Sequence, residues 1–543
     1  MSKAKWLFLF LVAISVAIPS YAVELSLGGF PSFMRTRYRF ISDGTFVSAL
    51  SDADARLLGF NDNSDNISFV DTRLRLTPQL VLSDAVTIRA QVDVADNMIW
   101  GGLTSGFAND RRTVVNSSLT PDDRFRGALL TDIGAGTVVS TFGEATATDD
   151  VQFFNVRMLH ADIVLPGNWG FVRIGRQPFD WGLGILANGG WDPMSDLGFV
   201  LDRFLYLKSW PLGGGTFTFV GVSDRLTQGA TLTTAAGDGY DILAVALIYN
   251  TPAFGGNLTL GVYDFPYIHQ EDVLSVGASQ TGILNPPVIP GGVSGIDLTW
   301  LNLYSGLIDW KSDVFRLVGE IQGAFGEVEG LLGGGQESDI SNQIIFAVRA
   351  EYYPGFPVKN IAAEFGWADG DSTDTTFDDF EGNVIHFNPA YNIDNLLFKH
   401  MIPNVYRLES SVANAFYARA WATVKLLDKL SFTPQVLVAW NEETTAPLVI
   451  GQDVDRYLGT EVEGTFTFHV HPGVTLDLIG SLVLAGDGLQ DLIEQQAGAT
   501  YALADFNGDG ASDGAAPPGG VDAEDLPFAL QARLLIYIDQ FFK

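Results

Sequence analysis

Period-two alternation of apolar and polar residues constrains this chain more than any other feature. In residues 33–40, one face carries Met34, Thr36, Tyr38 and Phe40, and the other carries Arg35, Arg37 and Arg39. Residues 70–80 and 86–94 repeat the pattern, and their polar faces carry Asp71, Arg73, Arg75, Arg89 and Asp93. A helix would spread these residues around its circumference, whereas a β-strand places alternate residues on opposite faces. The pattern therefore predicts strands.

Eighteen such runs can be counted. They begin near residues 30, 66, 84, 151, 169, 202, 214, 239, 256, 295, 313, 340, 358, 410, 429, 456, 473 and 526. Short turns rich in Gly, Pro, Asn and Asp alternate with long polar loops at residues 96–150, 178–201, 266–294, 370–404 and 487–525. This arrangement is typical of an all-β transmembrane antiparallel β-barrel of about 18 strands (16–18), with short periplasmic turns and long extracellular loops. A barrel of that size is wide enough to hold an aqueous channel.

Composition excludes several classes of protein. The 64 acidic residues outnumber the 31 Lys and Arg residues, so the basic footprint of a nucleic-acid-binding protein is absent. Because the chain has no cysteine, disulfide scaffolds and thiolate metal sites are excluded. No segment after the N-terminus offers 18 uninterrupted apolar residues, which argues against membrane-spanning helices.

Residues 1–22 are predicted to be a cleaved secretory signal peptide. Lys3 and Lys5 precede an apolar run at residues 6–18, and Ser20 and Ala22 supply the small residues at the cleavage site. Residues 23–543 are then expected to form a single barrel domain in the outer membrane of a Gram-negative-type bacterium. Its expected partners are outer-membrane lipid, lipopolysaccharide and the barrel-assembly machinery, whereas the oligomeric state stays open.

Three stretches carry a resemblance to a known family. They are residues 175–184 (GRQPFDWGLG) with Asn188-Gly189-Gly190 and Asp202-Arg203, residues 387–398 (FNPAYNIDNLLF), and residues 457–463 (YLGTEVE) running through His471-Pro472-Gly473 to Gly486. In order and spacing they resemble the alginate-export family of outer-membrane barrels and its porin relatives. The resemblance implies an 18-stranded barrel that passes polymers or solutes passively through an electropositive constriction.

Six arginines of the first three strands are the main candidates for solute binding. Arg35, Arg37, Arg39, Arg73, Arg75 and Arg89 should share one wall of the lumen, and only Asp71 and Asp93 lie among them. Neighbouring guanidinium groups could hold carboxylates or phosphates. Alternatively, they pair with acids from other walls, for which the candidates are Glu320 beside Arg316, Glu351 beside Arg349, Glu461, Glu463 and Asp477. Arg157, Arg349 and Arg419 are further lumen candidates. Single lumen charges such as Arg157, Arg419 and Arg533 more often belong to structural ladders than to binding groups.

The loop at residues 178–203 is a candidate constriction. Its residues Asp180, Trp181, Asp192, Asp202 and Arg203 could meet a solute if the loop folds inward. The alternative is a rigid cap packed at the rim of the barrel.

One acidic loop resembles the front half of a calcium site. Asp505, Asn507, Asp509 and Asp513 occupy ligand positions 1, 3, 5 and 9, and Gly510 occupies the turn position. Position 12 is Ala516 where an EF-hand has Glu, so a complete EF-hand is excluded, and a solvated acidic loop is the alternative reading. No other cofactor is expected.

The sequence therefore predicts a non-enzymatic porin for passive diffusion of small hydrophilic, anionic solutes, with an alginate-like saccharide as one candidate. A structural or adhesive surface barrel with calcium-binding acidic loops is the alternative. An outer-membrane hydrolase is a further one, but His386 and His400 stand in a loop where nothing orders them into a catalytic triad.

Overall fold

A computed structural model describes most of the strands and part of the connections between them. The described residues are 24–27, 30–42, 47–48, 67–99, 154–195, 198–228, 239–270, 297–329, 337–370, 379–380, 386–388, 390–402, 412–444, 453–493, 522–523 and 526–541. The predicted signal peptide and the proposed calcium ligands Asp505, Asn507, Asp509 and Asp513 lie outside them, as does most of the 96–150 loop.

The wall of the molecule is built from long antiparallel strands. They are β2 (Phe33–Ile41), β4 (Ile67–Leu76) with β5 (Pro78–Ser83), β6 (Val86–Ile99), β7 (Phe154–Leu165), β8 (Gly170–Pro178), β9 (Val200–Leu212), β10 (Gly215–Gln228), β11 (Gly239–Ala253), β12 (Gly256–Gln270), β13 (Asp297–Lys311), β14 (Phe315–Glu329), β15 (Glu337–Tyr352), β16 (Val358–Ala368), β18 (Ala415–Leu427), β19 (Leu430–Asn441), β20 (Tyr457–His471), β21 (Val474–Ala485) and β23 (Phe528–Tyr537).

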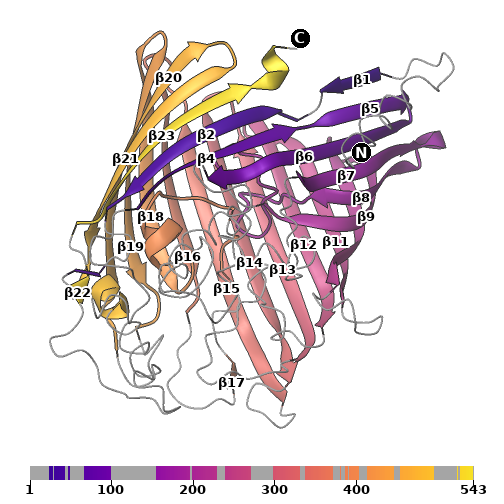
Figure 1. Ribbon diagram of the computed structural model, residues 1–543. Coiled ribbons are helices and arrows are strands. Elements are labelled where there is room, and N and C mark those ends of the chain that lie inside the picture. Colours follow the sequence, from indigo (N-terminus) through magenta and orange to yellow (C-terminus); the bar gives the residue numbers. More distant parts are fainter. Residues whose placement is uncertain are drawn as a thin grey trace, which may run out of the picture.

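These strands form a closed ring. Each pairs with the next one in the chain order just given, and β2 also pairs with β23, where Phe33 lies opposite Tyr537 and Ile41 opposite Ala529. In Figure 1 the indigo β2 and the yellow β23 accordingly lie next to each other. If β4 and β5, which are separated only by Thr77, are counted as one wall strand, the described residues form an 18-stranded barrel. The predicted fold class is confirmed.

The predicted strand positions agree with the observed ones. The first predicted start, near residue 30, corresponds to Phe33, and the last, near residue 526, corresponds to Phe528. Two of the predicted loops are shorter than expected, because β6 continues to Ile99 and β12 continues to Gln270. The extra residues pair with β4 and β13, so hydrogen bonding to a neighbouring strand extends the sheet into sequence that looks like loop.

The two faces of the wall differ as the alternation predicts. On β2, Arg35 is completely buried, whereas the side chains of Met34 and Tyr38 point outward and are 38% and 44% exposed. The same alternation on β11 exposes Leu243, Val245 and Leu247 and buries Ala244 and Ala246. An apolar outer face suits contact with lipid, and a closed ring leaves no backbone group of an edge strand unpaired.

The remaining described elements are short. They are β1 (Glu24–Leu27), β3 (Val47–Ser48), β17 (Asp379–Phe380), β22 (Asp522–Ala523), the single turns η2 (Pro166–Asn168), η4 (Leu397–Met401) and η5 (Ile538–Gln540), and a helical turn at residues 487–493. Within the described ranges, no helix is long and apolar enough to cross a membrane.

Candidate functional site

The β8–β9 connection, residues 179–199, folds into the barrel and lies against the arginines of the first strands. Arg35 Nη1 donates to the carbonyl oxygen of Pro193 at 2.6 Å, and Arg73 Nη1 donates to that of Ser195 at 2.7 Å. Arg75 Nη1 donates to Gly190 O at 2.7 Å. We call the described residues of this connection the first inward segment. The arginines of the wall therefore hold a protein segment through its backbone.

The same arginines are paired with the aspartates of their own wall. Arg37 Nη2 lies 3.0 Å from Asp71 Oδ1, and Arg75 makes two 2.7 Å hydrogen bonds to Asp93. Arg35 and Arg39 also approach Asp71, at 3.7 and 3.6 Å. Arg35, Arg37, Arg39, Arg73 and Arg75 are all at most 4% exposed. The predicted cluster exists, but it is covered rather than open to the lumen, and its acids come from the same wall.

The first inward segment is anchored to a distant strand by one carboxylate. Glu320 on β14 accepts the backbone N–H of Leu183, Gly184 and Ile185 at Oε2 (2.7, 3.0 and 3.4 Å), and that of Leu186 at Oε1 (2.9 Å). The segment thus runs from β2, β4 and β6 to β14, which stand far apart in the strand order of the ring. Glu320 was a candidate partner for the arginines of the first strands, but it binds the backbone of this segment instead, and its neighbour Arg316 pairs with Asp309 at 2.8 Å.

A glycine makes the close approach of Glu320 possible. Gly182 has φ of +56°, a conformation that residues with a Cβ seldom adopt. A Cβ at this position would lie 2.5 Å from Glu320 Oε2. The GLGIL sequence after Trp181 therefore allows the backbone to wrap around the carboxylate.

A second inward segment comes from the β16–β18 connection, at residues 386–388 and 390–402. Glu461 on β20 accepts the N–H of Asn395 at 3.1 Å and of Leu397 at 2.9 Å. Arg419 on β18 and Gln435 on β19 both donate to Ile393 O, at 2.9 and 2.8 Å. As with Glu320, a buried wall carboxylate satisfies backbone donors of a segment inside the barrel.

The two inward segments contact each other. Asn388 N–H donates to Ile185 O at 2.8 Å, and Asn188 Nδ2 donates to Ala390 O at 3.3 Å. Their apolar side chains, among them Ile185 and Phe387, belong to one cluster that also includes inward residues of the wall such as Val220. The interior is therefore narrowed by two segments that support each other and are fixed to several strands.

The other predicted site residues fall into smaller groups. Arg157 Nη2 donates to Gly189 O at 2.5 Å, so it also holds the first inward segment. Arg89 pairs with Asp162 at 3.0 Å. Arg349 and Arg419 both contact Glu364, at 2.5 and 2.9 Å.

The five predicted constriction residues are not brought to one surface. The side chain of Asp180 accepts hydrogen bonds from Gly189 N and Trp191 Nε1, and Asp192 accepts from Met194 N, so both stabilise the segment itself. The indole of Trp181 donates to Ser305 on β13 at 2.9 Å. Asp202 and Arg203 belong to β9 and pair separately, with Arg176 at 2.9 Å and with Asp224 at 2.6 Å.

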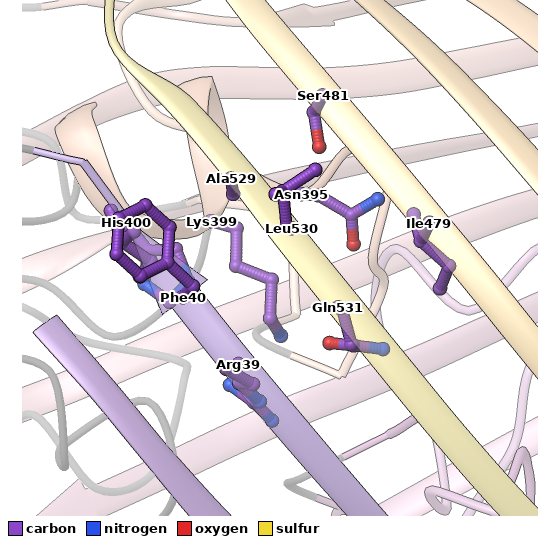
Figure 2. A pocket seen from close by; sticks show the side chains of 11 residues that line it. Arg39, Phe40, Asn395, Lys399, His400, Ile479, Ser481, Ala529, Leu530 and Gln531 are labelled. Atoms are coloured by element: carbon purple, nitrogen blue, oxygen red, sulfur yellow. The ribbon is translucent and has the colours of Figure 1, made fainter.

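Sequence reasoning missed the residues of the second inward segment that face the wall. Asn395, Lys399 and His400 line a pocket together with inward residues of β2, β21 and β23 (Figure 2). Ser481 and Gln531 could have been placed on the inward face by their two-residue spacing from Ile479 and Arg533. Lys399 gave no such signal, because the segment has no regular period.

No metal-binding cluster of three or more His, Asp or Glu side chains occurs among the described residues. The calcium hypothesis concerns residues outside that part of the chain.

Among known proteins, the matches to this chain are solved structures of similar overall fold. No protein-family profile and no curated protein match the chain. Among solved structures, OccAB1 of Acinetobacter baumannii is 11% identical, with 94% of this chain and 96% of that chain covered and a TM-score of 0.44. A BenF-like porin from Pseudomonas fluorescens is 8% identical, with 95% and 99% covered and a TM-score of 0.44.

A third solved structure is similar at the same level. The anion-selective porin from Comamonas acidovorans is 11% identical, with 95% of this chain and 99% of that chain covered and a TM-score of 0.37. Sequence identity and TM-score at this level do not identify a solute for this chain. The resemblance to the alginate-export family stays a prediction.

Proposed function

We propose that this protein is an outer-membrane channel for passive diffusion of small hydrophilic solutes. The observation that carries the proposal is the closed 18-stranded ring, whose interior holds two segments anchored to the wall. A ring of this size exceeds the eight strands that side chains alone can fill. Two inward segments would then set the diameter of the passage.

Anionic solutes are the class we expect the channel to favour. On the wall formed by β2, β4 and β6, the five arginines Arg35, Arg37, Arg39, Arg73 and Arg75 gather around the two aspartates Asp71 and Asp93. Because these arginines are buried, water screens their positive charge poorly, and we expect their field to act on solutes. Direct contact with all five guanidinium groups is not required.

Within that class, a uronate-like saccharide is one candidate solute, as the resemblance to alginate-export barrels implies. The proposal involves no covalent step, since charge and diameter would set the flux.

A plugged barrel with a structural or adhesive role is the second candidate. It is favoured by the apolar cluster that joins the two inward segments to the wall, because apolar packing excludes water from that part of the interior.

Swelling of proteoliposomes distinguishes the two candidates. Vesicles containing the purified barrel would be diluted into isotonic glucuronate or into glucose, a neutral solute of similar size. We expect swelling in both, faster in glucuronate. Equal rates would remove the anion preference and keep the channel, whereas no swelling in either solute would favour the plugged barrel.

A further inference from the structure

Charged side chains on the outer face of the wall are confined to one side of the barrel. Among the wall side chains that the structure describes more than five residues from a short turn, those of Arg176 on β8, Asp202 on β9 and Asp264 on β12 are the only charged ones that face outward. Each lies two positions from an exposed apolar residue of its own strand, so the two share a face. Those neighbours are Ile174 (47% exposed), Phe204 (47%) and Val262 (54%).

Aromatic rings occupy the corresponding height on the other side of the barrel. Trp440 on β19 and Asp202 on β9 both lie ten residues from the short-turn ends of their strands, at Leu430 and Leu212. Outward rings stack in a row there, with successive centroids 6.4, 5.4 and 5.3 Å apart, and the row consists of Phe346, Trp367, Phe416 and Trp440. In Figure 1, β8 and β9 lie on the right and β18 and β19 on the left. Aromatic rings suit a lipid boundary, whereas charges on a lipid-facing surface are destabilising.

The outward charges are bound by the wall but stay accessible. Arg176 Nε and Nη2 each donate to Asp202 at 2.9 Å, and the two side chains are still 33% and 50% exposed. Asp264 is exposed and accepts a hydrogen bond from Asn302 Nδ2 at 3.0 Å. No cation of the described residues pairs with Asp264. An accessible carboxylate at this height calls for a polar neighbour outside the chain.

Small and apolar residues lie between these charges. Gly221 on β10 is opposite Val245 on β11, and Val245 is opposite Asp264. Ser223 is exposed on the same face as Gly221. The connection after β8 folds into the barrel, so it does not cover this part of the outside. A second sheet can therefore approach closely here. We call this surface the outer patch, and it consists of Arg176, Asp202, Gly221, Ser223, Val245 and Asp264.

The order of charges makes the outer patch complementary to itself. Two copies in one membrane share their orientation, so a two-fold axis between them runs along the membrane normal. An axis beside β10 places β8 of one copy against β12 of the other, and the reverse. Arg176 then faces the partner's Asp264, because the two residues lie six and eight residues from the short-turn ends of their strands. Phosphate groups of lipopolysaccharide fit less well, since Asp202 and Asp264 repel them.

We propose that the outer patch is the contact surface of a homodimer with its two-fold axis beside β10. Arg176, which already binds Asp202, also binds the partner's Asp264, and this contact occurs twice. Gly221 and Ser223 lie at the axis, where their small side chains let the two walls meet. The dimer concerns only the outside of the barrel, so it holds whether or not the interior conducts.

Cysteine cross-linking of the full-length barrel in proteoliposomes tests the dimer. The chain has no cysteine, so a single-cysteine variant forms a disulfide only with another copy. Ser223→Cys lies beside the proposed axis, and most of the protein should form a dimer band on a non-reducing gel after mild oxidation. The matched control is Ala418→Cys, which also faces outward but lies on β18, nine residues from the short-turn end at Leu427. It should stay monomeric.

Sedimentation of the cysteine-free protein in detergent measures the association independently. Asp264→Asn keeps a side chain of the same shape and removes the charge, so it should weaken the dimer roughly tenfold or more. Asp428→Asn removes the charge of an exposed carboxylate in a short turn and should leave association unchanged.

Several results would overturn the proposal. Equal cross-linking of Ser223→Cys and Ala418→Cys would indicate random collision, and a protein that is monomeric in both experiments would exclude the dimer. An unchanged dissociation constant in Asp264→Asn would remove the charge pairing on which the orientation of the two copies rests. A monomer that binds lipopolysaccharide, and loses it in Arg176→Gln, would assign the outer patch to lipid.

Discussion

Glu320 Oε1 accepts the backbone N–H of Leu186 at 2.9 Å, which joins β14 to a segment whose other side is held by arginines of β2 and β4. The second carboxylate oxygen accepts three further N–H groups of the same turn. A single side chain therefore satisfies four consecutive backbone donors of the first inward segment. We expect the position of this segment to depend on Glu320.

Replacement of Glu320 should release the first inward segment. Glu320→Leu leaves the N–H groups of residues 183–186 without an acceptor, at a cost of about 1–3 kcal/mol for each buried donor. We expect a higher single-channel conductance than in the parent protein, with more frequent switching between current levels. Planar-bilayer recording of the purified variant measures both.

Two matched variants control this experiment. Glu320→Gln keeps one oxygen as acceptor and should fall between the parent and Glu320→Leu. Glu351→Leu removes a carboxylate of the neighbouring strand that contacts Arg349 and Tyr353, and should leave the conductance unchanged. An unchanged current in Glu320→Leu would contradict the role of this anchor.

Loss of Asp93 should destabilise the arginine cluster. Asp93→Leu leaves Arg75, which makes two 2.7 Å hydrogen bonds to it, as a buried charge without its partner, and such losses cost about 3–5 kcal/mol. We expect a lower unfolding temperature, read from the heat-dependent shift of the folded barrel in gel electrophoresis. Asp428→Leu removes the partner of an exposed pair and should leave that temperature unchanged. Equal unfolding temperatures for Asp93→Leu and the parent would mean that the cluster adds nothing to stability.

The docking of the second inward segment should weaken as pH rises. Burial raises the pKa of Asp394 from its usual value of 3.8 to about 7. Below pH 3.8 the carboxyl group is protonated whether the segment is docked or free. Between these two values only the free segment ionises, so docking is progressively disfavoured, and the effect levels off above about pH 7.

Hydrogen exchange of residues 394–402, corrected for the intrinsic effect of pH on exchange, measures this change. Protection should fall from pH 5 to pH 8 in the parent protein. Asp394→Asn, which cannot ionise, should show a smaller fall in protection between the two pH values. Protection that rises with pH in the parent would contradict the assignment.

The wall of the barrel could be predicted from sequence because its signal is local. Alternation over 9 to 16 residues is repeated in every long strand, and it places Arg35 inward and Met34 outward without knowledge of any partner. The cluster around Asp71 and Asp93 follows from the same rule, since paired strands bring inward residues together.

The inward segments could not be predicted in the same way. Glu320 and Leu186 are 134 positions apart, and no periodic pattern links a strand carboxylate to the backbone of a distant turn. Burial of the arginines was missed for the same reason, since the segment that covers them lies more than a hundred residues further along the chain from Arg35 and Arg73. Lys399 lies in a segment without regular alternation, so its approach to Arg39 is a product of tertiary packing.

The most direct test of the account is the current through the purified barrel in a planar bilayer, with the reversal potential measured under a KCl gradient. We predict a small, steady conductance, because two inward segments narrow the interior, and a reversal potential of the sign that chloride-selective permeation produces. A reversal potential of the opposite sign would contradict control by the arginine wall. The absence of any conductance would contradict the channel itself.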